Sequence, residues 1–563
     1  MVETPVLWKK WAIAAVGIII VVAVLVGPGF SKYRQLKEQR ALTTAQAAFA
    51  KGDYRSAVLS AQQVLQLNPT NTAGCELMAQ LADLAKSPTT LDWRQKVAEA
   101  VPAVENKLLL AEAALRYQSR PYPLTSQILS ELAPTATNVV KFHLVCAEYA
   151  LALRQLGAAA AHFAAAAELA PTNRLYRLNL ALIELSSTQT DKLAAARANL
   201  QSFLTDTNLA APALRSLITD SLAHGESVDA RNFSEQLLRT PQITLADHLQ
   251  HLRILKNLSS PDFSAELAAL KKNATTNLPG TVQIALWMEA NQLAPEAAVW
   301  LAGLPASFRQ QPTVAMARAS ALETTGDWPA LRDFCAHGDW QEINFLRLAF
   351  LSRAWTQMGE LAVASGNWHA AVDNAGNRYG ALIGLLELSA RWHLAPERQD
   401  LFWLLLQKFP RERWISQALE QQCLATGDTP GLWRIYQQLS ATFPGEIGWQ
   451  NNFAYTALLL KKNSAAAEAL AAKLQKQSPT NASIASTYAF ALHLRGHNAE
   501  ALAVMQPLPP AELRSSAVAL HYGILLAATG KTAEAEPYLA IARNETSLLP
   551  EEKALLAAAS AQH

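Results

Sequence analysis

Glycines that end helix-like runs recur along this chain, and the residues at fixed distances from them match. These glycines are Gly52, Gly225, Gly326, Gly366, Gly427, Gly496 and Gly530. Five positions later stand Ala57, Ala230, Leu331, Ala371, Leu432, Ala501 and Ala535. Seven positions earlier stand Ala45, Ala319, Gly359, Ala489 and Gly523, with Ile218 and Glu420 as exceptions. Two antiparallel helices approach closely only where side chains are small, and glycine permits a turn with positive φ. The pattern therefore predicts helix pairs in which the two small positions face each other.

The segments between these glycines also read as helices. Alanine- and leucine-rich runs carry apolar residues three and four positions apart, and the alternation typical of strands is nearly absent. Pro69 and Pro444 each lie 17 residues after their glycine, where a proline stops the second helix. Gly496 and Gly530 are 34 residues apart. We therefore expect an all-α chain of tandem helix pairs, and its 50% hydrophobic content supplies a large core.

These units resemble the tetratricopeptide repeat (TPR), a 34-residue helix–turn–helix motif with small residues at the interhelical crossing. The clearest units are Ala41–Pro69, Ser483–Leu508 and Ala519–Ala542, and Leu144–Pro171 is a fourth with a shortened turn. They lack the motif tryptophan of the first helix, and residues 240–312 show helix pairs without a defined register. The resemblance implies an α-solenoid, a superhelix whose concave face binds extended peptides or partner helices, and it implies binding rather than catalysis.

The resemblance also implies which residues contact partners. First helices of the repeats usually line the concave face in this family, which makes Asn452, Tyr455 and Tyr488 candidate partner-binding residues. Ordinary packing and capping is the alternative, because tyrosine and asparagine also satisfy internal hydrogen bonds.

One segment near the start predicts attachment to a membrane. Trp11–Phe30 carries no charge and is flanked by Lys9, Lys10 and Lys32. About 20 apolar residues at about 1.5 Å rise span roughly 30 Å, the thickness of a bilayer hydrocarbon core. A cleaved signal peptide is the alternative, but its apolar region is usually shorter and ends in a small-residue cleavage site. We expect a single-pass transmembrane helix.

The orientation of this helix is less constrained. Basic residues after the span favour a cytoplasmic body, whereas long domains translocate largely regardless of charge. The two lysines before the apolar run resemble an uncleaved export signal, so the interpretation favours an extracytoplasmic, periplasmic solenoid at a bacterial inner membrane.

These features divide the chain into five parts. They are an N-terminal tail at 1–10, the transmembrane helix at 11–30, N-terminal TPR-like repeats at 31–200, degenerate helical repeats at 201–345, and a C-terminal TPR array at 346–563. The array ends in a helix starting at Pro550, with acids in its first turn, which we expect to cap it.

Composition and motifs argue against several function classes. The net charge of +2 disfavours nucleic acid as a partner. The four cysteines are widely spaced, so no disulfide or zinc site is expected. Gly530-Lys531-Thr532 lacks the upstream glycine and strand of a phosphate-binding loop. His248 and His251 beside Asp247, and His493 with His497, fall short of the three or four ligands a metal site needs. We expect no catalytic residue, metal or cofactor.

Eleven of the fourteen tryptophans fall between Trp287 and Trp449. Such enrichment is typical of core packing between imperfect repeats, although it also occurs in recognition grooves. An all-α enzyme with a pocket in this tryptophan-rich region is therefore one alternative function, and a structural spacer is another. The main hypothesis is a membrane-anchored scaffold or adaptor for protein partners. Its layout is similar to bacterial inner-membrane TPR proteins of secretion, envelope assembly or polysaccharide export, a layout shared by many functions.

Overall fold

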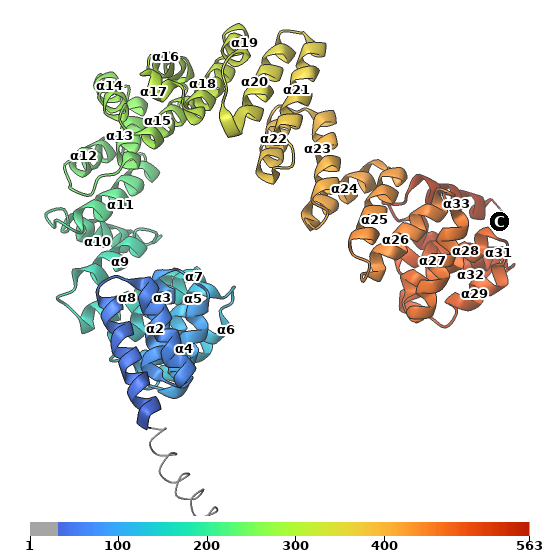
Figure 1. Ribbon diagram of the computed structural model, residues 1–563, viewed down its shortest axis with the longest axis horizontal. Helices are drawn as coiled ribbons and strands as arrows, with labels where there is room; N and C mark the ends of the chain where they lie inside the picture. The colour runs from blue at the N-terminus through green and yellow to red at the C-terminus, as the bar shows by residue number, and fades with distance from the viewer. Residues whose placement is uncertain (1–31, 562–563) are drawn as a thin grey trace, which may run out of the picture. The chain divides into compact units, whose positions relative to one another are not determined.

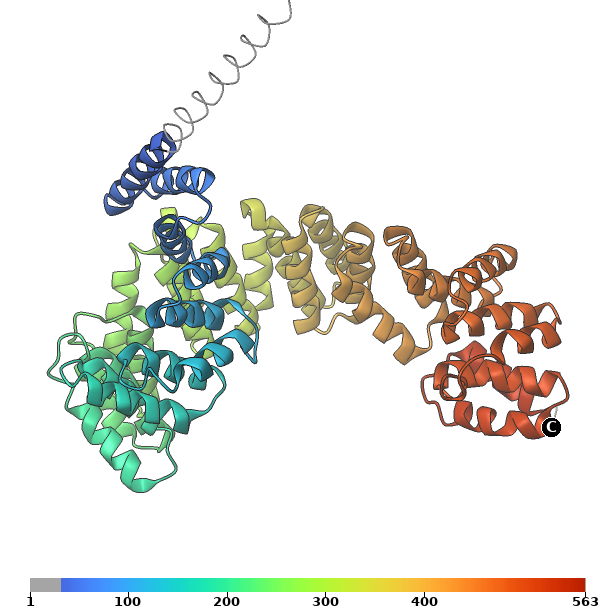
Figure 2. The ribbon, with the colours of Figure 1, turned by 90° about the horizontal axis from the view of Figure 1, so that it is seen from below.

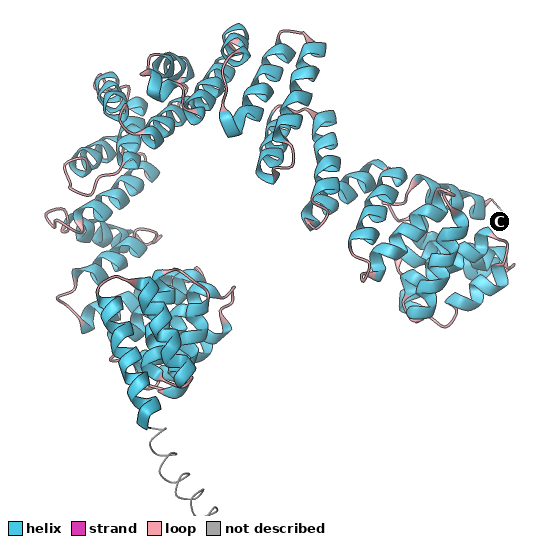
Figure 3. Ribbon diagram, viewed as in Figure 1, coloured by secondary structure: helices cyan, strands magenta, loops and turns pink. Residues whose placement is uncertain are grey.

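The structure is all-α, as expected. The computed structural model describes residues 32–561, and in that range the chain consists of helices joined by short turns, with no strand (Figure 3). The segment 11–30, for which the sequence predicts a transmembrane helix, lies outside the described residues. Within them, no helix has both the length and the apolar character needed to cross a bilayer.

The chain divides into two compact units, one reaching to Lys272 and the other starting at Asn273. Figure 1 labels the helices of both units. Nothing tests the finer division at residues 200 and 345, which stays a prediction. The first unit contains a helix over residues 32–50, followed by α2 (Tyr54–Leu67), α3 (Thr72–Leu84), α4 (Thr89–Ala100), α5 (Val104–Tyr117), α6 (Pro123–Leu132), α7 (Val140–Ala152), α8 (Leu156–Leu169), α9 (Arg174–Glu184), α10 (Thr190–Gln201), α11 (Ala210–Ala223), α12 (Ser227–Leu237), α13 (Leu245–Asn257) and α14 (Phe263–Ala274), whose last two residues fall in the second unit.

The second unit continues the same succession of helices (Figure 2). Its elements are α15 (Leu278–Ala290), α16 (Ala294–Ala302), α17 (Ala306–Arg309), α18 (Pro312–Thr325), α19 (Trp328–Ala336), the 3-10 helix η1 (Gln341–Ile343), α20 (Asn344–Gln357), α21 (Leu361–Ala375), α22 (Tyr379–Arg391), α23 (Ala395–Lys408), α24 (Arg413–Thr426), α25 (Thr429–Thr442), α26 (Ile447–Leu459), α27 (Ser464–Gln477), α28 (Ala482–Leu494), α29 (Asn498–Met505), α30 (Pro510–Leu513), α31 (Ser516–Ala528), α32 (Thr532–Arg543) and α33 (Pro550–Ser560).

Six of the seven glycines lie in turns between paired helices. Each has a φ between +69° and +83°, which only glycine adopts without strain. Gly366 was assigned wrongly, because it lies inside α21, exposed, with an ordinary helical backbone. The turn of that pair is at Gly359, whose φ is +86°. The sequence pattern was therefore shifted by seven residues in this one unit.

The predicted small positions form the contact between paired helices. Ala57, Ala230, Ala501 and Ala535, each five residues after a turn glycine, are fully buried. In the corrected pair, the hydroxyl of Ser352, seven residues before Gly359, donates to the carbonyl of Ala364, five residues after it, at 2.7 Å. The two helices therefore meet at the predicted crossing point.

Polar contacts between neighbouring pairs repeat with nearly the same period. Arg174 pairs with Asp206 and Arg215 with Asp247, both 32 residues apart in sequence. In the second unit, Arg413 pairs with Glu446, 33 residues later. Equivalent positions of adjacent pairs are thus in contact, which is the arrangement of tandem repeats stacked on each other. Together with the turns and crossings, this establishes tandem helix-pair repeats in both units.

Part of the tryptophan-rich region is core. Trp340, Trp368 and Trp392 are at most 5% exposed. Phe350 contacts two of them, with ring centroids 6.4 Å from Trp340 and 5.6 Å from Trp392. These three tryptophans fill space between helix pairs, whereas Trp414 is 39% exposed. The four cysteines are buried free thiols.

Candidate partner-binding surfaces

The first helices of successive pairs contact one another in both units. In the first unit α5 contacts α7, and in the second α18, α20 and α22 form one series and α26, α28 and α31 another. We call the face that these helices present the first-helix surface. It is the face on which the sequence placed the candidate residues Asn452, Tyr455 and Tyr488.

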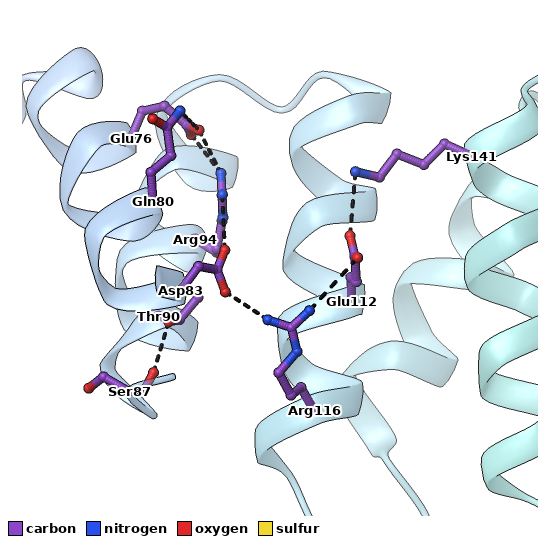
Figure 4. Close-up of polar contacts among 9 residues, drawn as sticks. All are labelled: Glu76, Gln80, Asp83, Ser87, Thr90, Arg94, Glu112, Arg116 and Lys141. Carbon is purple, nitrogen blue, oxygen red and sulfur yellow. Dashed lines mark hydrogen bonds and ion pairs between the residues drawn. The ribbon is translucent and has the colours of Figure 1, made fainter. Parts of the chain in front are cut away.

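In the first unit, the helices α3, α4, α5 and α7 are linked by a ladder of opposite charges (Figure 4). Arg94 Nη1 lies 2.7 Å from Glu76 Oε1, and Arg94 Nη2 lies 3.3 Å from Asp83 Oδ2. Asp83 also accepts from Arg116 at 2.9 Å. The ladder extends to α7 through Glu112, whose carboxylate lies 4.0 Å from Arg116 Nη2 and 3.4 Å from Lys141 Nζ. Because each charge has an opposite neighbour, the ladder joins successive pairs at low electrostatic cost.

In the second unit, the C-terminal helix α33 lies against the first-helix surface. It packs on α31 and α32, as a capping helix does, and it also reaches two much earlier helices. The hydroxyl of Thr429, at the start of α25, donates to Glu551, 122 residues later. The phenol of Tyr455, on α26, donates to Glu552. Pro550 sits against the turn at Gly427, where an added Cβ would lie 3.2 Å from the proline ring.

One carboxylate of α33 has two functions. Glu552 accepts from the phenol of Tyr455 through Oε1, and its Oε2 accepts from the backbone N–H of Leu549 at 2.7 Å, which caps the helix N-terminus. Burial, then the charge and hydrogen bond of Glu552, raise the pKa of the Tyr455 phenol well above its usual value. The phenol therefore stays protonated and remains a donor to Glu552.

His521, on α31, is in contact with Tyr455. Its Nε2 is 3.5 Å from the Tyr455 hydroxyl, and its Nδ1 is 2.9 Å from the hydroxyl of Ser486. The ring also packs at 4.8 Å on that of Phe490. Burial, with a smaller contribution from the charge of His493, lowers the pKa of His521 to about 3. The imidazole is therefore neutral at physiological pH.

A pocket of about 240 Å³ remains open beside α33. Asn452 and Tyr455, both candidates from the sequence, line it together with Tyr436, His521 and Glu552. Tyr488 lies elsewhere, partly buried against the C-terminal core. Sequence reasoning missed Thr429, His521, Glu551 and Glu552 as parts of this surface. The Pro550-Glu551-Glu552 motif was noticed, but only as a helix start, because nothing local indicates what the acids contact.

The tryptophan-rich region has a second pocket, of about 560 Å³, lined by Arg309, Arg318, Phe334, His337 and Trp340 among others. The Arg318 guanidinium lies 4.4 Å from the ring centroid of Phe334. Burial, and then the nearby charge of Arg309, lower the pKa of Arg318. Two arginine side chains, Arg309 and Arg318, thus line this pocket. The enzyme alternative requires several acids or histidines that converge on one pocket. Among the residues that line this pocket, Asp339 is the only acid and His337 the only histidine.

The histidine pairs considered as metal ligands are used in other contacts. Asp247 accepts from Arg215 at 2.9 Å, and His251 Nδ1 lies 2.8 Å from the hydroxyl of Ser234. His493 Nδ1 lies 2.7 Å from the side-chain oxygen of Asn498. In residues 32–561, no three or more histidine, cysteine, aspartate or glutamate side chains are grouped so as to hold a metal ion.

Comparison with known proteins adds little to this picture. No protein-family model matches the chain, and no curated protein matches it either. Among solved structures, it is similar to a chain of the "Crystal structure of APC/C hetero-tetramer Cut9-Hcn1", at 12% sequence identity and a TM-score of 0.29, over 93% of this chain and 96% of that chain. A TM-score this low does not establish a shared fold, so the assignment of helix-pair repeats depends on the turns, burial and contacts described above.

Proposed function

We propose that this protein is a scaffold that binds other proteins on the first-helix surface of its helix pairs. The observation that carries the proposal is the position of α33, which packs on α31 and α32 and also bonds to residues of the much earlier helices α25 and α26. A surface that accepts one helix in this way has the shape and the hydrogen-bonding groups to accept a partner helix, a common mode of peptide recognition.

The scaffold is proposed to be held at a membrane by residues 11–30. Support comes from the sequence: the run is uncharged, has the length of a bilayer span and is flanked by lysines. We further propose a bacterial inner membrane with the repeats on its outer side, and a part in envelope assembly, secretion or polysaccharide export. Here the support is the layout of one anchor followed by TPR-like repeats.

Site-specific photo-crosslinking in cells tests the binding surface. Tyr379 lies on the first helix α22 and is 37% exposed, so a photoreactive residue placed there should crosslink to partner proteins. The matched control is Leu361, on the second helix α21, which is 66% exposed and so more accessible. Crosslinking at Tyr379 with none at Leu361 supports the proposal. Equal crosslinking at both positions, or none at either, contradicts it.

Protease treatment of intact spheroplasts tests the topology. An antibody against the C-terminus follows digestion, and a cytoplasmic marker protein controls for integrity. Digestion without lysis is expected if the repeats are outside. Protection until lysis would place them in the cytoplasm and contradict the proposed orientation. A chain lacking residues 1–31 should leave the membrane fraction, and its retention there would contradict the anchor.

A further inference from the structure

We propose that α33 is the internal occupant of a helix-binding site, and that the external ligand of this site is a partner helix beginning with two adjacent acids after an apolar turn. The α33 site is defined by Gly427, Thr429, Tyr455 and His521. The inference rests on the proposed function, because it names the partner chemistry of the first-helix surface and a device that regulates access to it.

The α33 site recognises the first turn of a helix by hydroxyl donors. Thr429 donates to Glu551 and Tyr455 donates to Glu552, while Glu552 also caps its own helix. Neither acid forms an ion pair with a described basic side chain within 4 Å. Any helix with acids at the same two positions would satisfy both hydroxyls, and neutral side chains would not replace the charge-assisted bonds.

Apolar contacts fix the register of this helix. Leu549, just before α33, is 5% exposed, and Pro550 occupies the space that the missing side chain of Gly427 leaves. A ligand therefore needs a leucine or similar residue and then a proline before its acids. Proline also suits this place because it is well tolerated in the first turn of a helix.

α33 extends well beyond the position of a simple cap. A cap covers the apolar side of the last pair, here α31 and α32, and needs no other contact. Glu551 and Glu552 instead bind residues on α25 and α26, which belong to earlier helix pairs than α31 and α32. The Tyr455 contact lies on the first-helix surface that a partner would use, and the Thr429 contact lies at its edge, where the second helix α25 begins.

α33 buries far less of its own surface than α31, the helix it packs on. Only Leu556 and Ala559 are buried within α33, against nine residues in α31 and three in α32. An isolated helix of this length is only marginally stable in water, so release and unfolding are coupled. Segments with few buried contacts open at lower free energy than the core. α33 is thus suited to exchange with an external ligand.

The space around α33 is consistent with entry of a second chain. The pocket beside it has a volume of about 240 Å³, equal to the liquid share of roughly eight water molecules. Its apolar lining includes Leu424, which is 41% exposed at the surface. A partner segment therefore has an open, partly apolar place beside α33 at which to make first contact.

A labelled peptide with the sequence of residues 545–561 tests the inference on the purified full-length chain. Its binding is measured by fluorescence anisotropy to the wild type and to Leu556→Asp, which weakens the internal helix. Because an internal ligand competes at high effective concentration, the apparent Kd should be at least about tenfold lower for Leu556→Asp than for the wild type. Circular dichroism confirms that the variant is folded.

Matched changes identify the chemistry. A peptide with Glu551→Gln and Glu552→Gln should lose binding, whereas one with Lys553→Ala, on the exposed side of α33, should bind like the parent. Adding Thr429→Val and Tyr455→Phe to Leu556→Asp should abolish binding. Hydrogen exchange provides a second test in the unmodified chain: amides of α33 should exchange faster than those of α31, and faster still with excess peptide.

The results separate this inference from the proposed function. Failure of the peptide to bind folded Leu556→Asp, equal binding to wild type and variant, or exchange of α33 as slow as that of α31 would overturn the inference. Crosslinking at Tyr379 would still support the scaffold in that case. If the peptide binds as expected while Tyr379 and Leu361 give no crosslinks, the α33 site stands and the broader scaffold function fails.

Discussion

The phenol of Tyr455 donates its hydrogen bond to the carboxylate of Glu552, a residue 97 positions later in the chain. This bond connects the middle of the C-terminal array to its last helix. Tyr455, a candidate from the sequence for contact with partners, therefore has an acceptor within its own chain. On the proposed binding surface, a partner would have to compete with Glu552 for this hydroxyl.

Tyr455→Phe should loosen α33. The change removes the donor to Glu552 Oε1 and leaves a partly buried carboxylate oxygen unsatisfied, which costs about 1–3 kcal/mol. We expect hydrogen exchange in residues 550–560 to speed up by roughly one to two orders of magnitude, since each 1.4 kcal/mol is tenfold. The control is Tyr33→Phe, at a site 63% exposed. Unchanged exchange in Tyr455→Phe would contradict the structural role of this bond.

His521 should make stability depend on pH in acid. Its pKa is lowered from 6.5 to about 3, mainly by burial, so the unfolded chain binds a proton that the folded chain does not. The stability that the neutral ring contributes is complete above pH 6.5 and is lost as the pH falls toward 3, with a slope of up to about 1.4 kcal/mol per pH unit.

The measurement is the difference in urea unfolding between wild type and His521→Gln at several pH values. The difference should shrink as the pH falls through this window, because only the wild type carries the buried imidazole. His369→Gln, at an exposed histidine, serves as the control for the substitution itself. A difference that is constant from pH 7 to pH 4 would be incompatible with a neutral, buried His521.

Gly523→Ala should destabilise the last helix pair. A Cβ at this position would lie 2.8 Å from Leu539 Cδ2 and 3.2 Å from the Leu539 backbone nitrogen. Overpacking of this kind costs about 1–3 kcal/mol. The melting temperature of the full chain should fall, together with protection from hydrogen exchange in α31 and α32.

Gly366→Ala is the matched control for a glycine inside a helix. A Cβ there meets no atom within 4 Å, and the residue is exposed in the middle of α21. Alanine is favoured over glycine in a helix interior by about 0.5–1 kcal/mol, so this variant should be slightly more stable than the wild type. Destabilisation would instead support a turn at Gly366, the assignment that the structure corrects.

Arg94→Ala should disrupt the charge ladder of the first unit. The Arg94 side chain is 7% exposed and pairs with both Glu76 and Asp83. Its removal leaves Glu76 without its ion-pair partner and Asp83 with Arg116 alone, and we expect a loss of about 2–4 kcal/mol, near the range for breaking buried pairs. Arg413→Ala, in a pair whose arginine is 62% exposed, should cost less than about 1 kcal/mol. Urea unfolding of the full chain measures both.

The sequence predicted the elements whose determinants are local. Six turn glycines and the small residues beside them were identified because a positive φ and a close helix crossing each demand a particular residue at one place. Gly366 was misassigned for the same reason: Ala371, five residues later, reproduced the pattern by coincidence. Only the structure shows that Gly359 makes the turn.

Of the residues around the pocket beside α33, the sequence indicated those on α26 but not those on α33. Asn452 and Tyr455 follow from their position in a first helix, and both line the pocket beside α33. Glu552, the partner of Tyr455, was not predictable, because no local signal connects residues that the fold brings together from far apart in the sequence. The ion pairs between neighbouring repeats, such as Arg215 with Asp247, were within reach, since their separation matches the repeat period.

Ion pairs one period apart, such as Arg215 with Asp247, join only neighbouring helix pairs, so the gain or loss of a whole repeat elsewhere would leave them intact. The stretch from α26 to α33 is different. Tyr455 and Glu552 are in contact only if the number of helices between them is correct, so this bond requires a fixed number of repeats. Insertion or loss of one repeat between them would separate the two residues even if every remaining pair folded normally. The bond from Thr429 to Glu551 makes the same demand, so we expect variation in repeat number to spare the stretch from α25 to α33.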